Sequence, residues 1–106
     1  MNLEHISVHK FRDMIDDEKY VILDVRTEDE FKEGHLENSQ LIDFYSDNFR
    51  DELAKLDKDK EYLVYCHSGG RSGKCMNMMG ELGFKNVYNM AGGILDWTAN
   101  QYEVTK

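Results

Sequence analysis

One segment limits what this chain can fold into more than any other. An apolar stretch, Tyr62–Tyr65, ends at Cys66, and two glycines, Arg71 and a stretch with helical spacing follow. A strand that leads into a tight glycine loop and a helix directs successive backbone N–H groups toward one point, with the helix dipole behind them. A thiol at the head of such a loop is favoured as the thiolate, because the amides and Arg71 both stabilise negative charge. The segment therefore predicts a sulfur nucleophile in an anion-binding loop.

Helix-forming and strand-forming stretches alternate along the rest of the chain. We expect strands near 5–7, 20–25, 40–43, 62–65 and 86–89. We expect helices near 8–15, 27–33, 46–56 and 71–82, and a last one from 93 onward. Thr27 and Glu30 have the spacing of a capping box, and Gly34 and Gly83 are expected to end helices. This alternation is typical of an α/β domain around a mostly parallel sheet.

The length and net charge of the chain limit the classes of protein to which it can belong. A chain of 106 residues is expected to form a single domain over 1–106, and a monomer is the default. The net charge of −8 argues against nucleic acid and anionic membranes as partners. No apolar run approaches the roughly 20 residues of a membrane helix, and the N-terminal residues do not resemble a secretory signal. We therefore expect a protein of the cytoplasm.

The two cysteines, Cys66 and Cys75, are expected to be free thiols without the spacing of a metal site. Most free cysteines are inert core residues, so Cys66 also has a purely structural interpretation. Its position before two glycines and Arg71 favours a functional role. Cys75 shares a helical face with apolar neighbours, which favours a core position over that of a resolving thiol.

Three separated blocks of the chain resemble the rhodanese-like sulfurtransferases. The first comprises Leu23–Arg26, Glu30-Phe31 and Gly34–Leu36; the second is the loop Cys66–Ser72; the third comprises Gly83-Phe84, Val87, Met90–Ile94 and Trp97. The resemblance covers nearly the whole chain and implies a three-layer α/β domain, a five-stranded sheet with helices on both faces. The residues between Asn38 and Phe49 depart from the family pattern, so the rim of the site is less defined than the loop.

The resemblance implies a thiosulfate sulfurtransferase-like enzyme that needs no cofactor or metal. Cys66 would take a sulfane sulfur from a small anionic donor such as thiosulfate, and a thiol, cyanide or a sulfur-relay protein would accept it. Arg71 would hold the shape of the loop and attract the donor. The remaining loop residues would bind the substrate; they are His67, Ser68, Gly69, Gly70 and Ser72. Phosphatases and arsenate reductases on the same fold have one more residue before the arginine, and the shorter loop here favours a single sulfur atom.

Other interpretations stay open. The chain could instead be a sulfur carrier or regulatory module that depends on a partner protein. Asp24 and Arg26 could support the loop, although a structural ion pair or turn contact is favoured. His35 could line the site, although a hydrogen bond to a carbonyl is favoured. The acidic residues of 28–33 are expected to be solvated, with repulsion of wrong partners or docking of a basic sulfur donor as the alternatives.

Overall fold

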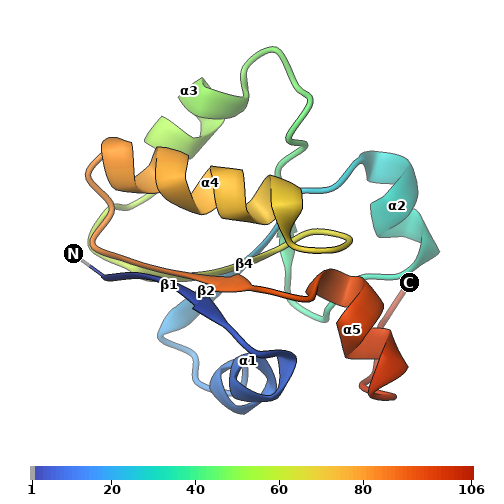
Figure 1. The fold of residues 1–106 in the computed structure, drawn as a ribbon. Coiled ribbons are helices and arrows are strands. Elements are labelled where there is room, and N and C mark those ends of the chain that lie inside the picture. Colours follow the sequence, from blue (N-terminus) through green and yellow to red (C-terminus); the bar gives the residue numbers. More distant parts are fainter. Residues whose placement is uncertain (1) are drawn as a thin grey trace.

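A five-stranded sheet forms the centre of the computed structural model, which describes residues 2–106 (Figure 1). The strands are β1 Asn2–Ile6, β2 Tyr20–Asp24, β3 Gln40–Leu41, β4 Glu61–Tyr65 and β5 Asn86–Met90. They lie in the order β1-β5-β4-β2-β3, and every pairing between them is parallel. The predicted α/β fold around a mostly parallel five-stranded sheet is confirmed.

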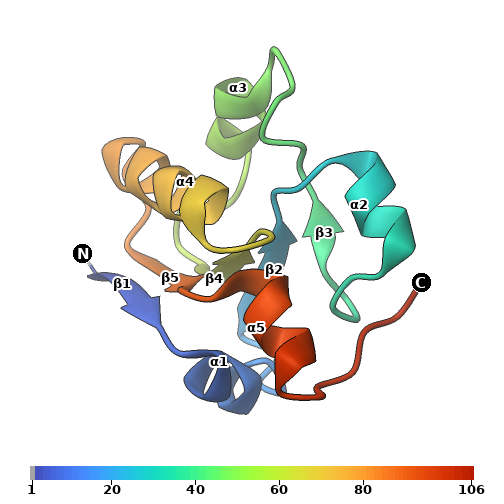
Figure 2. The ribbon, with the colours of Figure 1, turned by 45° about the vertical axis from the view of Figure 1, so that its right-hand side comes forward.

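Helices cover both faces of the sheet. They are α1 Val8–Met14, α2 Glu28–Glu33, α3 Phe49–Ala54, α4 Gly70–Glu81 and α5 Gly93–Ala99. α3 and α4 lie on one face and α1 and α5 on the other (Figure 1), while α2 lies beside the edge strand β3 (Figure 2). One buried cluster, which includes Leu53 and Met79, packs under α3 and α4, and a second, which includes Phe11 and Trp97, packs under α1 and α5. The predicted three-layer arrangement is therefore confirmed. No helix in the described part of the chain has the length and apolar character needed to span a membrane.

Local capping explains several helix boundaries. Thr27 and Glu30 form the predicted capping box at the start of α2. Gly83, which follows α4, has the positive φ of +96° that favours glycine after a helix. The helix expected over 46–56 is shorter at both ends, because α3 spans only Phe49–Ala54. The Ser46 hydroxyl accepts a hydrogen bond from the backbone N–H of Asn48 at 3.2 Å, and such side-chain contacts compete with helical hydrogen bonds.

The parallel topology positions the site. Because β2, β4 and β5 run in the same direction, their carboxyl ends meet at one edge of the sheet. Asp24 ends β2, Cys66 follows β4 and Met90 ends β5 at this edge. The crevice at the carboxyl ends of the strands is where open α/β sheets bind their ligands.

Candidate active site

Cys66 lies directly after β4, in a short loop that leads into α4. In Figure 1 this loop extends toward the gap between α2 and α5. Cys66 is only 1% exposed, whereas His67 and Ser68 are exposed. The structure thus brings the predicted loop residues together around one buried sulfur atom.

The Cys66 sulfur accepts two hydrogen bonds from the loop. The backbone N–H of Gly69 donates one at 3.1 Å and the buried Ser72 hydroxyl donates the other at 3.3 Å. Burial raises the pKa of the Cys66 thiol, but the Ser72 hydroxyl and the backbone amides of Ser72, Gly69 and Ser68 stabilise the thiolate more. The net pKa lies below that of an ordinary cysteine. The geometry therefore favours a reactive thiolate, and Ser72 contributes its side chain as well as its backbone.

Replacing Ser72 by alanine should raise the pKa of Cys66, because the hydrogen bond from the Ser72 hydroxyl, the strongest single contact that stabilises the thiolate, is lost. Below the new pKa a smaller fraction of Cys66 is ionised, so its alkylation by iodoacetamide should slow by roughly tenfold at neutral pH. The rate should recover at alkaline pH, where both proteins are fully ionised. The measurement is the alkylation rate as a function of pH, and an unshifted profile would remove Ser72 from thiolate stabilisation.

Backbone hydrogen bonds from the start of α5 fix the position of the Cys66 loop. The backbone N–H of Ile94 donates to the carbonyl of Cys66 at 2.9 Å, and that of Leu95 donates to the carbonyl of His67 at 3.0 Å. Gly93 has a φ of +64°, and a Cβ there would overlap the carbonyl of His67. Only glycine allows this close approach of two backbones. The third sequence block therefore fixes the shape of the loop that carries the cysteine.

Arg71 pairs with a carboxylate from another helix. Its two terminal nitrogens donate to the two carboxylate oxygens of Glu30 at 2.8 and 2.9 Å. This contact holds the pKa of Glu30 down to about 2, well below that of an ordinary carboxyl. From the sequence, Glu30 was assigned to the capping box and to an acidic stretch expected to be solvated, so its contact with the loop was missed. Its position in the first sequence block was the available signal, but no local pattern joins residues 41 positions apart.

Asp24 and Arg26 form a buried ion pair below the loop. The Arg26 guanidinium donates to Asp24 at 2.7 Å and to the backbone carbonyl of Gly34, also at 2.7 Å. The Tyr65 hydroxyl donates to the same carboxylate at 2.7 Å and accepts from the backbone N–H of Leu36 at 3.0 Å. These bonds tie β2 and β4 to the segment after α2. The favoured interpretation of a structural ion pair agrees with this geometry.

His35 also has a structural environment. Its Nδ1 lies 2.8 Å from the carbonyl oxygen of Phe31, and the two rings stack with centroids 3.6 Å apart. The backbone of His35 pairs with that of Thr105 near the C-terminus. These contacts agree with the favoured hydrogen bond to a carbonyl rather than with a side chain that lines the site.

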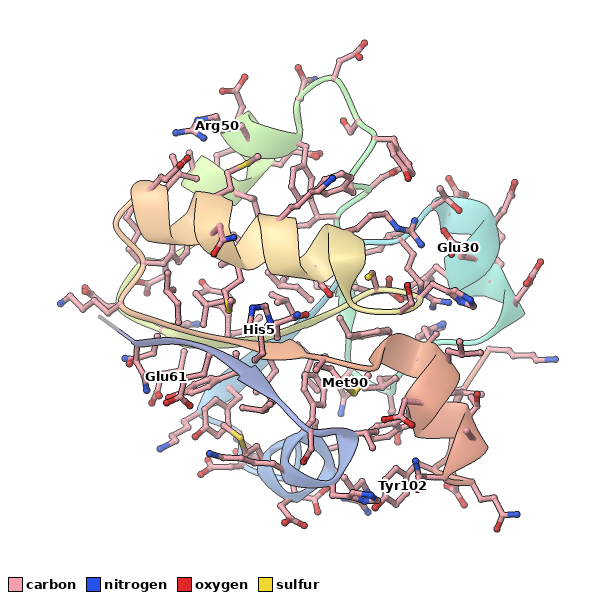
Figure 3. The ribbon with its side chains drawn as sticks, in the orientation of Figure 1. His5, Glu30, Arg50, Glu61, Met90 and Tyr102 are labelled. Atoms are coloured by element: carbon pink, nitrogen blue, oxygen red, sulfur yellow. The ribbon has the colours of Figure 1, made fainter. Side chains whose placement is uncertain are left out.

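Asn89, on β5, is a buried residue near the loop that the sequence did not single out. Its side-chain nitrogen lies 3.3 Å from the carbonyl oxygen of Gly69 and 3.0 Å from Nδ1 of His5. Figure 3 shows His5 between the sheet and α4. The Asn89 Oδ1 is buried without a hydrogen-bond partner among the described residues. A buried amide of this kind gave no sequence signal, because its two partners lie in β1 and in the loop before α4, far from it in the sequence.

Cys75 lies on the buried face of α4, in the same core cluster as Cys66. It is fully buried, and burial raises the pKa of its thiol to about 12. Both cysteines are free thiols in the structure. The core position that the sequence favoured for Cys75 is therefore what the structure shows.

Replacing Cys75 by serine should lower stability and leave sulfur chemistry at Cys66 largely unchanged. A serine hydroxyl buried at this position would lack a partner matched to it, which costs about 1–3 kcal/mol. Urea unfolding and turnover measured on the same preparation would separate the two effects. Complete loss of turnover in a folded variant would indicate a resolving thiol instead.

No group of three or more histidine, cysteine or acidic side chains with the arrangement of a metal site occurs within residues 2–106. The groups that the structure brings together at this edge of the sheet are the Cys66 thiol, the loop amides, Ser72 and the Glu30–Arg71 pair. Such a site can stabilise a sulfur anion and make it a nucleophile.

Comparison with known proteins agrees with this geometry. Residues 7–100 match the family model of the rhodanese-like domain, a family of sulfurtransferase-like domains. A rhodanese-related protein from Thermoplasma volcanium is 30% identical, with a TM-score of 0.85 over 96% of this chain and 97% of that one. A rhodanese-like domain protein from Staphylococcus aureus is 26% identical, with a TM-score of 0.80 over 97% and 99% of the two chains.

One relative is named for an activity other than that of the rhodanese-like proteins. The tRNA uridine(34) hydroxylase of Photorhabdus laumondii is 33% identical over 106 aligned positions, which cover 94% of this chain. The aligned part is only 30% of that protein. The chain therefore spans about a third of the length of the curated relatives that it matches.

Proposed function

Because the chain belongs to the rhodanese-like domain family, we propose that it transfers a sulfane sulfur from a donor to a thiophilic acceptor through a persulfide on Cys66. The observation that supports this most directly is the environment of the Cys66 sulfur. It is buried in the loop between β4 and α4 and accepts hydrogen bonds from Gly69 and Ser72. These preorganised donors stabilise negative charge on sulfur, as an oxyanion hole does on oxygen.

The proposed transfer has two steps. In the first, the Cys66 thiolate attacks the outer sulfur of the donor, a new S–S bond forms, and the bond between that sulfur and the rest of the donor breaks. The leaving group departs with the electron pair of the broken bond, as sulfite when the donor is thiosulfate. In the second step an acceptor thiolate or cyanide attacks the outer sulfur of the persulfide, and Cys66 leaves as the thiolate. Covalent catalysis thus divides one difficult transfer into two easier ones.

The loop residues would have separate roles in these steps. The amides near Ser68 and Gly69 and the Ser72 hydroxyl would stabilise the thiolate and the charge on the outer persulfide sulfur. Arg71, held by Glu30, would keep α2 against the loop. The exposed side chains of His67 and Ser68 would face the incoming donor or acceptor.

Turnover with small substrates tests the proposal. The protein is incubated with cyanide and either thiosulfate or methanethiosulfonate, which carries one negative charge fewer, and thiocyanate is measured. We expect thiocyanate formation that follows saturation kinetics. Its absence with both donors, in a folded protein whose Cys66 is reduced, would contradict the simple enzyme and favour a carrier that depends on a partner protein. Hydrolysis of an aryl phosphate that requires Cys66 would instead indicate a phosphatase.

A second candidate function comes from the curated relatives named tRNA uridine(34) hydroxylase. Similarity over 94% of the chain favours a role for this domain within such a protein, with the remaining activity in residues beyond those aligned. The charge of −8 makes binding of a polyanion by this domain alone unfavourable. A gel-shift titration with bulk tRNA at low salt tests this. Binding there would favour the second candidate, and its absence would show that any tRNA contact in such a protein lies outside this chain.

A further inference from the structure

The Glu30–Arg71 pair changes the charge that a sulfur donor meets at the Cys66 loop. Both terminal nitrogens of Arg71 donate to Glu30, so the fork that could bind an anionic donor in a bidentate manner is already occupied. One face of the guanidinium lies over the ring of Tyr45, with 5.7 Å between the central carbon and the ring centroid. Figure 3 labels Glu30 on α2, beside the loop that enters α4.

Glu30 is ionised at neutral pH, because its pKa is held down to about 2. Hydrogen bonds from Arg71 are the main cause of its low pKa, and bonds from Thr27 lower the pKa further. The carboxylate therefore cancels the charge of Arg71 from acidic to alkaline pH. Arg26, which is near Glu30, is itself paired with Asp24 and buried.

The surroundings of the pair are acidic rather than basic. α2 carries Glu28 and Asp29 in its first turn beside Glu30, and both are exposed. The whole chain carries 21 acidic residues against 13 lysines and arginines. The electrostatic field of the rest of the chain is therefore negative rather than positive. A dianion that approaches Cys66 therefore meets a neutral ion pair within a negative field. A donor with less charge meets a smaller electrostatic barrier.

We propose that Glu30 is a specificity-determining residue that disfavours dianionic sulfur donors, such as thiosulfate, relative to donors with one negative charge or none. The inference rests on the proposed sulfur transfer and concerns only the class of donor. Both classes react by the same balanced step. Thiosulfate gives the Cys66 persulfide and sulfite, and methanethiosulfonate gives the same persulfide and methanesulfinate. Because the transferred sulfur is the same, the two donors differ at Cys66 mainly in charge and in the leaving group.

The test compares the two donors in the wild-type protein and in Glu30→Gln. Glutamine at this position of a capping box can still accept the hydrogen bond from Thr27, so α2 keeps its cap while the charge is removed. We expect kcat/KM for thiosulfate to rise relative to that for methanethiosulfonate by about three- to tenfold. The matched control is Glu28→Gln, since Glu28 lies on the same helix and pairs with the exposed Lys32 at 3.1 Å. This control should change the ratio much less.

The ratio separates charge selection from a positioning role. If Glu30 acted only by holding Arg71 in place, both donors would lose activity together and the ratio would stay constant, which would overturn the inference. In that case the proposed sulfur transfer would stand. If neither thiosulfate nor methanethiosulfonate gives a persulfide in the wild-type protein, both the proposed function and the inference are overturned.

Salt dependence of the wild-type protein gives a second test that does not need the variant to fold. Screening weakens repulsion between like charges. We therefore expect added potassium chloride to raise kcat/KM for thiosulfate more than for methanethiosulfonate. A steeper fall with thiosulfate would show that Arg71 attracts the dianion despite its pairing with Glu30, and this would contradict the inference.

Discussion

Replacing Cys66 by alanine should reduce sulfur transfer by at least about a thousandfold, to the rate without protein, because the transferred sulfur then has no atom to bind. The fold should survive, since Cys66 follows β4 rather than forming part of it and its side chain is small. We expect a stability loss of only about 1 kcal/mol. Thiocyanate production and urea unfolding measured together would check both expectations.

Cys66→Ser provides the matched control for the alanine variant. The serine hydroxyl keeps the approximate shape of the side chain and can still accept the bonds from Gly69 and Ser72. It does not ionise near neutral pH and should be as inactive as alanine. A substantial rate in either variant would show that another group, such as Cys75, accepts the sulfur.

Replacing Gly69 by alanine should damage the site more than any other single change in the loop outside Cys66. Gly69 has a φ of +102°, which disfavours other residues, and a Cβ there would overlap the backbone carbonyl of Ala91. That carbonyl belongs to the segment between β5 and α5 and cannot move without shifting the start of α5. We expect a stability loss of about 2–4 kcal/mol. Turnover should fall at least about a hundredfold, because the Gly69 amide no longer points at the sulfur.

The neighbouring glycine is the control for this prediction. A Cβ at Gly70 meets no atom within 4 Å, and its φ is not in the left-handed region. Gly70→Ala should therefore fold and turn over sulfur almost as the wild-type protein does. Equal effects of the two substitutions would contradict the argument that the loop is held by close backbone contact at Gly69.

Features that depend on neighbouring residues were predictable from the sequence. The strand before Cys66, the glycine loop and α4 are consecutive, so the apolar run, the glycines and the helical spacing together indicated them. The capping box of Thr27 and Glu30 was equally local. The boundaries of α3 were wrong at both ends: the side-chain bond of Ser46 competes with the helix before Phe49, and after Ala54 the backbone N–H groups of Lys55 and Leu56 bond to carbonyls only three residues back.

Contacts between distant residues were not predictable in the same way. The pairing of Glu30 with Arg71 joins two helices, and the contact of Asn89 with Gly69 joins a strand to a loop. Both depend on the strand order of the sheet, which a single sequence does not encode as a pattern. As a result, the buried cysteine and its loop were predictable from the sequence, whereas the charge balance beside them became visible only in the fold.

The most direct test of the account is the intact mass of the protein after treatment with methanethiosulfonate and removal of excess donor. We predict the added mass of one sulfur atom, its loss on treatment with cyanide or a reducing thiol, and no addition in Cys66→Ala. Addition that persists in Cys66→Ala, or a folded and reduced wild-type protein that gains no sulfur from either donor, would contradict the account of Cys66 as the sulfur carrier.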